Sequence, residues 1–353
     1  MTERECAEFA IGKDDLVLVT GATGFIGKRL VRTLLGRGFR NLRCFARPSS
    51  DVGALFEDSG EGSSVEVFTG NLLSREDCLA ATKGAKVIFH LAAGTAEKSF
   101  AGAYLNSVVT TRNLLEAART HGCLCKIVTI SSFVVYTNSG KRGRLLDESC
   151  PIEAHPDKRG DAYCYAKVRQ DEFVAAYCDR AGIPYVIVRP GYVYGPGKVA
   201  ITGRVGIDTF GFFLHLGGSN PVPFTYIDNC AEAIMLAGLK KESDGQVFNV
   251  VDNALPSSRK FLRQYKRHVK RFRSIYVPHF LSYLLCYAWE RYSVWSEGQL
   301  PPAFNRLKWH VLWKKTRYSN QKLKVLLGWS PKVSIAEGLS RYFEACRSGG
   351  GNA

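Results

Sequence analysis

The sequence lacks the features that mark several large classes of protein. The first fifteen residues, MTERECAEFAIGKDD, contain no apolar core or cleavage site, so we expect no signal peptide. The eleven cysteines are scattered, and the one close pair, Cys123 and Cys125, has no second pair to complete a zinc site. We therefore expect reduced thiols, no metal and a cytoplasmic protein.

Acidic residues are nearly absent from one region of the chain. Residues 255–324 contain sixteen Lys or Arg and only two acids, Glu290 and Glu297, a net charge of +14. The whole chain carries +16, so the remainder is close to neutral. The positive charge therefore belongs to one region and needs a regional explanation.

Short apolar runs alternate with helical patterns up to about residue 190. We expect strands at 16–20, 42–46, 65–69, 87–93, 126–132 and 185–190. Because these runs are apolar on both faces, they predict a parallel α/β sheet with helices on each side. After residue 190 the order breaks down, with one more apolar strand at GQVFNVVD and a mostly helical last hundred residues.

The stretch LVLVTGATGFIG places Gly21, Gly24 and Gly27 between an apolar strand and an amphipathic helix. Side chains at these three positions would obstruct the turn, a phosphate and the strand–helix packing, respectively. A glycine turn of this kind lets the helix N-terminus bind a pyrophosphate, which predicts a dinucleotide site. The alternative is a tight turn that binds no ligand.

The residue twenty positions after Gly27 bears on the choice of dinucleotide. An acid there would bind the ribose 2′-hydroxyl of NAD, whereas an Arg would accommodate the 2′-phosphate of NADP. The sequence has Arg47 at this place and no acid before Asp51. The cofactor prediction is NAD(P), with NADP favoured over NAD, against the alternative of a solvated loop arginine.

The stretch YCYAK carries a candidate proton donor. Tyr163 and Lys167 lie four residues apart and share a helical face, so the ammonium, helped by a positive nicotinamide ring, would lower the tyrosine pKa. The same spacing occurs at Tyr194/Lys198 and Tyr318/Lys322, but only Tyr163 follows an apolar strand that ends in hydroxyls. Ser132, at that strand end, could donate to the same substrate oxygen. Either Ser131 or Ser132 could instead be a strand-end cap.

With glycines, serine, tyrosine and lysine in this order, the chain resembles the extended short-chain dehydrogenase/reductase family, the NAD(P)-dependent epimerase/dehydratase group. The likeness runs from about residue 16 to 343, through TGATGFIG, FHLAAG, TISSFVVY, YCYAK, RPGYVYGPG, FTYIDNCAEAI and LGWSPKVSIAEGL. It implies a Rossmann-type doubly wound parallel sheet and a smaller, mostly helical C-terminal substrate domain. It also implies Ser132, Tyr163 and Lys167 as catalytic residues.

The resemblance implies a set of cofactor contacts. The backbone at Pro190 and Gly191 would contact the nicotinamide amide, and Ala92 and Ala93 would line the cofactor. The predicted cofactor-binding residues are Gly21, Thr23, Gly24, Phe25, Ile26, Gly27, Arg47, Asn71, Leu72, Ala92, Ala93, Tyr163, Lys167, Pro190 and Gly191.

Three positions depart from the pattern of the family. Asn71 stands where an acid usually lies near the adenine, although its amide could still bind a base edge. Ser107 occupies the place of a helical asparagine, with Asn106 one position off. Tyr192 stands where nucleotide-sugar members commonly carry a substrate-contacting asparagine, which weakens that substrate assignment.

The expected division of the chain follows the same resemblance. Residues 13–190, with 222–253 returning to them, form the NAD(P)-binding domain. Residues 191–221 and 254–346 form the substrate-binding region, and residues 1–12 and 347–353 are flexible termini. A homodimer is an expectation from the family alone.

The basic stretch 257–295 has three interpretations. Its first helix packs an apolar face on the domain and leaves its charges solvated; or the charges attract an anionic substrate; or the segment rests on an anionic membrane surface. The apolar part is too short and too interrupted to span a bilayer. A similar segment occurs in the steroid- and sterol-dehydrogenase branch of the family. No nucleic-acid-binding motif is present, so we expect no nucleic-acid partner.

These observations predict an NAD(P)-dependent oxidoreductase or epimerase that moves a hydride between a carbinol carbon and the nicotinamide C4. A nucleotide sugar is the favoured substrate, because it is the commonest one in the group and suits the cationic region. The alternative is a sterol-like or other lipid alcohol handled at a membrane surface. A catalytically silent dinucleotide sensor is a third class, which the intact Ser–Tyr–Lys set argues against.

Overall fold

A seven-stranded parallel sheet forms the centre of the protein. The computed structural model describes residues 9–55, 64–95, 97–138, 140, 143–198, 200–209, 211–297, 299 and 304–349. The strand order is β12-β7-β5-β4-β1-β2-β3, with every neighbouring pair parallel. The strands are β1 (Val17–Thr20), β2 (Asn41–Ala46), β3 (Ser64–Thr69), β4 (Val87–His90), β5 (Lys126–Ile130), β7 (Tyr185–Pro190) and β12 (Gln246–Val250). All seven predicted strands are present.

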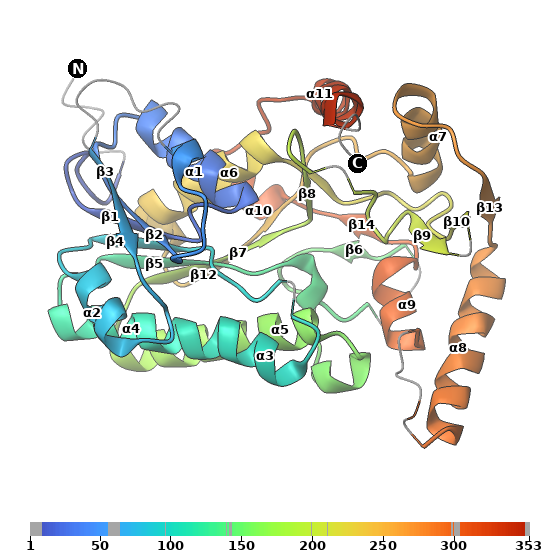
Figure 1. The fold of residues 1–353 in the computed structure, drawn as a ribbon, viewed down its shortest axis with the longest axis horizontal. Helices are drawn as coiled ribbons and strands as arrows, with labels where there is room; N and C mark the ends of the chain where they lie inside the picture. The colour runs from blue at the N-terminus through green and yellow to red at the C-terminus, as the bar shows by residue number, and fades with distance from the viewer. Residues whose placement is uncertain are drawn as a thin grey trace.

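Helices cover both faces of this sheet (Figure 1). One layer contains α1 (Phe25–Gly36) and α6 (Ile227–Leu239), and the other contains α2 (Arg75–Thr82), α4 (Thr110–His121) and α5 (Ala162–Ala181). The strand order reverses between β1 and β4, which is where ligands bind in doubly wound folds. The predicted Rossmann-type α/β fold is confirmed.

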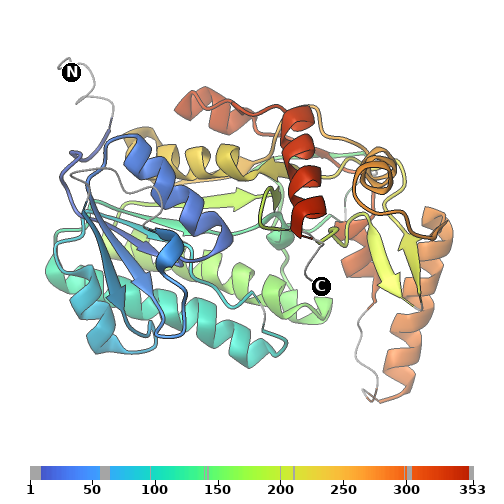
Figure 2. The ribbon, with the colours of Figure 1, turned by 45° about the horizontal axis from the view of Figure 1, so that its top comes forward.

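Most of the C-terminal region lies beyond the carboxyl ends of the central strands (Figure 2), whereas residues 321–327 pack against β12 and α6. It is helical, as predicted, with α7 (Ser258–His268), α8 (His279–Trp295), α9 (Arg306–Leu312), α10 (Gln321–Leu327) and α11 (Ile335–Gly349). It also contains small sheets formed by β8 (Tyr192–Tyr194) with β11 (Phe224–Tyr226), by β9 (Gly206–Thr209) with β10 (Phe212–His215) and β13 (Ser274–Tyr276), and by β6 (Leu145–Leu146) with β14 (Arg317–Tyr318).

The predicted termini fall partly outside the described residues, which exclude 1–8 and 350–353. The described parts of those segments are folded: the amide of Ala10 donates to the carbonyl of Leu239 (2.7 Å), and α11 continues to Gly349. The ten cysteines in the described ranges are free, and eight of them are buried. Within the same ranges no helix is long and apolar enough to cross a membrane.

A buried ion pair attaches α5 to the sheet. Arg189, in β7, donates from Nη2 and Nε to Asp171 Oδ2, in α5, at 2.9 and 3.1 Å. The hydroxyl of Ser131, directly after β5, donates to the same oxygen at 2.9 Å. The two charged side chains are only 7% and 4% exposed. Ser131 therefore joins the end of β5 to α5.

A chain of buried hydrogen bonds runs from the central sheet to α4 and α5. Thr20 Oγ1 lies 2.7 Å from His90 Nδ1, and His90 Nε2 lies 2.9 Å from Thr111 Oγ1. Gln170 donates to that threonine oxygen at 2.8 Å and accepts from Lys167 Nζ at 2.8 Å. Burial lowers the pKa of His90 to about 3, so the imidazole is neutral. The chain links the end of β1 to α5.

We expect Asp171→Ala to destabilise the protein strongly, because it leaves the Arg189 guanidinium buried without its partner. The expected loss is about 3–5 kcal/mol in the free energy of unfolding, measured by urea denaturation. The control is Glu172→Ala, next to Asp171, which breaks an exposed pair with Arg169 and is expected to cost about 0.5 kcal/mol or less. Equal losses in the two variants would contradict this assignment.

We expect His90 to make the protein sensitive to acid. The unfolded chain binds a proton at His90 below a pH of about 6.5, whereas the folded protein does not until about pH 3, so stability falls as pH falls between these values. The stability advantage of wild type over His90→Gln should shrink by about 2–3 kcal/mol between pH 7 and pH 4.5. A difference between wild type and His90→Gln that stays constant with pH would refute the assignment.

Candidate active site

The glycine turn after β1 has the shape that its sequence predicts. Gly21 adopts a left-handed conformation (φ +68°), and a Cβ there would lie 2.8 Å from the Ala92 nitrogen. A Cβ at Gly27 would overlap the Gly21 carbonyl oxygen, and one at Gly24 would lie 3.1 Å from it. Glycine is thus required at Gly21, because L side chains rarely adopt positive φ, and at Gly27, because the helix there lies directly against the backbone of the turn.

The same turn fits the pyrophosphate of a dinucleotide. Gly24 is exposed and precedes the first turn of α1, and no side chain of the described residues caps this helix. The amides of its first turn, at Phe25, Ile26 and Gly27, can therefore bind an anion, aided by the positive end of the helix dipole. Thr23 lies half-buried in the same turn.

The predicted adenine end of the site lies at β2 and β3. Arg47 is exposed and directly follows β2, the strand that pairs with β1. Asn71 follows β3, and its side-chain oxygen accepts from the amide of Leu73 at 3.0 Å, so that oxygen is used in a local turn. Leu72 is buried against the apolar core.

The other predicted cofactor contacts also lie near strand ends of the sheet. The Ala92 amide donates to Thr20 Oγ1 at 3.3 Å, which brings the Ala92–Ala93 segment against the glycine turn. Gly191 follows Pro190 at the end of β7, and its amide donates to the Val250 carbonyl at 2.9 Å. A Cβ at Gly191 would overlap the carbonyl oxygen of Pro223, so backbone packing alone explains this glycine.

Ser132 and Tyr163 meet at the carboxyl edge of the sheet. Ser132 is the second residue after β5 and caps the short helical turn Phe133–Val135, where its Oγ accepts from the Val134 amide at 3.3 Å. Tyr163 lies in the first turn of α5, which Asp161 caps by accepting from the Tyr163 and Cys164 amides. Burial raises the pKa of Tyr163 to about 12, although the neighbouring Ser132 hydroxyl acts in the opposite direction.

Lys167 lies one turn further along α5, on the same face as Tyr163. Its Nζ donates to the Ile130 carbonyl at 2.5 Å and to Gln170 Oε1 at 2.8 Å. Burial lowers the pKa of Lys167 to about 8. The sequence predicts that this ammonium lowers the pKa of Tyr163; in the structure Ile130 and Gln170 hold it, and burial dominates at the tyrosine.

Ser107, in the place of the family's helical asparagine, lies in a π-helical turn, Leu105–Val109, between α3 (Phe100–Tyr104) and α4. Its hydroxyl accepts from the Gly94 amide at 3.2 Å, next to the predicted cofactor-lining segment. Its carbonyl accepts from Gln170 at 3.4 Å, which connects it with the Lys167 partner. Asn106 instead donates to Glu97 at 2.9 Å.

The structure brings two residues to this region that the sequence pattern dismissed as coincidental spacing. Lys198 Nζ lies 5.7 Å from the centre of the Phe25 ring, beside the glycine turn, and 4.4 Å from that of Tyr192. Tyr318 stacks on Phe133, the residue after Ser132, with ring centres 5.5 Å apart. Sequence spacing does not predict that Lys198 and Tyr318 lie here, and only the three-dimensional structure shows these contacts.

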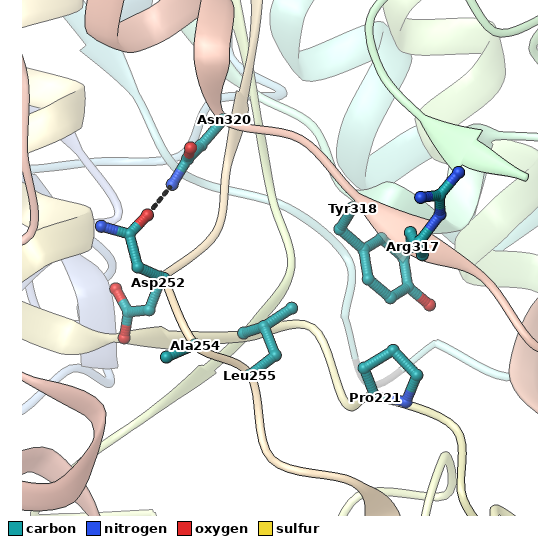
Figure 3. Close-up of a pocket in the computed structure, with 8 residues that line it drawn as sticks. Pro221, Asp252, Ala254, Leu255, Arg317, Tyr318 and Asn320 are labelled. Atoms are coloured by element: carbon teal, nitrogen blue, oxygen red, sulfur yellow. Dashed lines mark hydrogen bonds between the residues drawn. The ribbon is translucent and has the colours of Figure 1, made fainter. Parts of the chain in front are cut away.

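Tyr318 also lines a hollow of about 340 Å³ (Figure 3). Asn320 hydrogen-bonds Asn253 at its rim, and Tyr318 lies across from Leu255. Its lining comprises Pro221, Asp252, Asn253, Ala254, Leu255, Arg317, Tyr318 and Asn320. A second hollow, of about 620 Å³, lies between α3 and α5. Neither is lined by Ser132, Tyr163 or Lys167.

The chain is similar in sequence and in structure to known proteins. The family model described as "NAD dependent epimerase/dehydratase family" matches residues 17–250 of this chain. The 3beta-hydroxysteroid-dehydrogenase/decarboxylase isoform 1 of Arabidopsis thaliana is 26% identical over 93% of this chain and 79% of its own length. The sterol-4-alpha-carboxylate 3-dehydrogenase, decarboxylating, of Mus musculus is 25% identical over 94% of this chain and 91% of its own length.

Among solved structures, the UDP-glucuronic acid 4-epimerase from Bacillus cereus in complex with NAD superposes with a TM-score of 0.68. It is 23% identical and covers 94% of this chain and 99% of its own, a likeness that shows the fold. The family match extends from β1 to β12 and so includes the whole central sheet. The chain belongs to the NAD dependent epimerase/dehydratase family.

Proposed function

We propose that the protein oxidises a secondary hydroxyl of a sterol-like lipid alcohol, with NAD(P)⁺ as hydride acceptor. The observation that carries the proposal is the Ser132–Tyr163 hydroxyl pair beside Lys167, at the sheet edge that also holds the glycine turn. The choice of substrate is supported by the hydroxysteroid and sterol dehydrogenases, which match more than nine tenths of the chain.

In this proposal each residue acts on the substrate hydroxyl. Ser132 donates to the substrate oxygen and orients it, and the Tyr163 phenolate accepts the hydroxyl proton. When bound, NAD(P)⁺ accepts the hydride from the carbinol carbon. Lys167 lies one turn from Tyr163 and favours its phenolate form once released from Ile130 or Gln170.

The names of the relatives suggest a second consequence of the oxidation. If the carbon next to the carbinol carries a carboxylate, oxidation yields a β-keto acid. That product loses CO₂ by cleavage of its own carbon–carbon bond, and the electron pair is taken up by the neighbouring ketone. Decarboxylation therefore needs no further catalytic group in this chain.

A nucleotide sugar is the second candidate substrate, favoured by the cationic region 255–324. Tyr192 argues against it: this residue replaces the asparagine of nucleotide-sugar members, and its hydroxyl donates to the Ala200 carbonyl at 2.9 Å. The two candidates separate in one assay, in which NAD(P)H formation is followed with 3β-hydroxysterols and with UDP-sugars. Turnover of UDP-sugars alone would overturn the lipid proposal.

We expect Tyr163→Phe to lower kcat by about 10²–10⁴-fold, because the variant has no group to accept the hydroxyl proton. The measurement is the rate of NAD(P)H formation at saturating alcohol. The control is Tyr194→Phe, which alters a buried tyrosine of the Tyr194/Lys198 pair and should keep near-normal kcat. Full turnover by Tyr163→Phe would exclude the proposed role.

The NADP preference is a proposal that rests on Arg47. We expect Arg47→Ala to weaken NADPH binding about tenfold or more while changing NADH binding little, since the guanidinium would pair only with the 2′-phosphate. Fluorescence titration of both nucleotides measures the effect, with exposed Arg40→Ala as the control. An equal loss for both nucleotides, or tighter binding of NADH by wild type, would contradict it.

A further inference from the structure

Helix α8 exposes most of its apolar residues, together with Arg291, and the side chains that it buries are small or polar, the reverse of an ordinary surface helix. The side chains buried against the protein are Ser282, Cys286 and Ser293. Phe280 and Trp295 are each 75% exposed, and Leu285 is 57% exposed. The other apolar residues exposed on this helix are Leu281, Leu284, Tyr287, Ala288, Tyr292 and Val294.

This exposed face belongs to an anchored helix. Arg306, in α9, forms a two-pronged ion pair with Glu290 of α8, at 3.0 Å to each carboxylate oxygen. The indole Nε1 of Trp309 donates to Ser282 Oγ at 2.9 Å. Figure 1 shows α8 along the outer edge of the protein with α9 on its inner side. The polar residues of α8 thus hold it to the protein and leave its apolar side outward.

The segment that leads into α8 is strongly basic. Residues 257–276 contain eight Lys or Arg and no acid. Seven of these are exposed: Arg259, Lys260, Arg263, Arg267, Lys270, Arg271 and Arg273. The apolar side of α7 is itself buried, with Phe261 and Leu262 in the core, so α7 presents charge and α8 presents the apolar surface.

We propose that the apolar face of α8 inserts into the interfacial layer of an anionic lipid bilayer, while the basic residues of 257–276 bind lipid headgroups. A helix with an aromatic and aliphatic face, flanked by Lys and Arg, lies in the plane of such an interface. Each Lys or Arg near an anionic membrane adds attraction that salt screens. Binding through this face does not depend on which reaction the protein catalyses.

The charge distribution favours a bilayer over a second copy of the chain. Two copies paired through α8 would bring two segments of like charge together, since the flanking residues carry eight positive charges each. An anionic surface instead neutralises this charge. Self-association through α8 is therefore one of the outcomes that the test must detect.

The test is co-sedimentation of the purified full-length protein with phosphatidylcholine vesicles that contain about 30% phosphatidylserine. We expect binding at low salt, weaker binding at high salt, and little binding to phosphatidylcholine alone. Phe280→Ser/Trp295→Ser should weaken binding about tenfold or more, because it removes the two most exposed apolar side chains of the face. Arg267→Gln/Arg271→Gln should weaken binding and flatten its salt dependence.

Matched controls distinguish binding through the α8 face from non-specific adsorption to vesicles. Val325→Ser alters an equally accessible apolar side chain on α10 (69% exposed) and should bind as wild type does. Lys83→Gln/Lys241→Gln removes two exposed charges elsewhere and should also have no effect. Sedimentation without vesicles gives the oligomeric state. Three results would each overturn the proposal. They are no binding at low salt, binding by Phe280→Ser/Trp295→Ser equal to that of wild type, and a dimer that those substitutions dissociate while no vesicle binding occurs.

Discussion

The bonds that Asp171 receives from Arg189 and Ser131 hold together the elements on which the candidate site depends. Tyr163 and Lys167 lie on α5, whereas Ser132 lies at the end of β5, and nothing in local sequence requires these to meet. Asp171 lies on α5 together with Tyr163 and Lys167, and Ser131 directly precedes Ser132 in the sequence. Arg189 adds β7, and the ring of Tyr136 lies 4.8 Å from its guanidinium carbon. A buried carboxylate without these donors would be costly, so the cluster favours one position of α5.

The sequence predicted the fold because the fold depends on local patterns. Apolar runs marked every strand of the central sheet, and the positions of Gly21 and Gly27 follow from a turn that no side chain fits. The partners of Lys167 could not be predicted in this way. Gln170 is a polar residue on a helix, and only the fold shows that it joins Lys167 to Thr111 and His90.

Two features of the structure were not predicted from local patterns. Tyr318 lies more than 180 residues from Phe133 in sequence, yet the two rings stack, because β14 pairs with β6 close to the helical turn that follows Ser132. For 257–295, one interpretation placed the apolar face of the first helix on the protein with its charges solvated, and α7 has this arrangement. Helix α8 differs, because the residues that it buries are small or polar. Hydrophobic periodicity identifies a stripe on a helix but does not say which side meets the protein.

The proposed membrane face and the candidate site are connected through a single helix. Asn305, at the start of α9, donates to the Arg159 carbonyl at 2.9 Å, and Arg159 in turn binds the Val134 carbonyl and Cys164 Sγ. Val134 and Cys164 are close neighbours in sequence of Ser132 and Tyr163. At the other end of α9, the carbonyl of His310 accepts from Asn138 at 2.8 Å. A bilayer that holds α8 thus also restrains α9, and α9 is bonded to both segments that position the two hydroxyls.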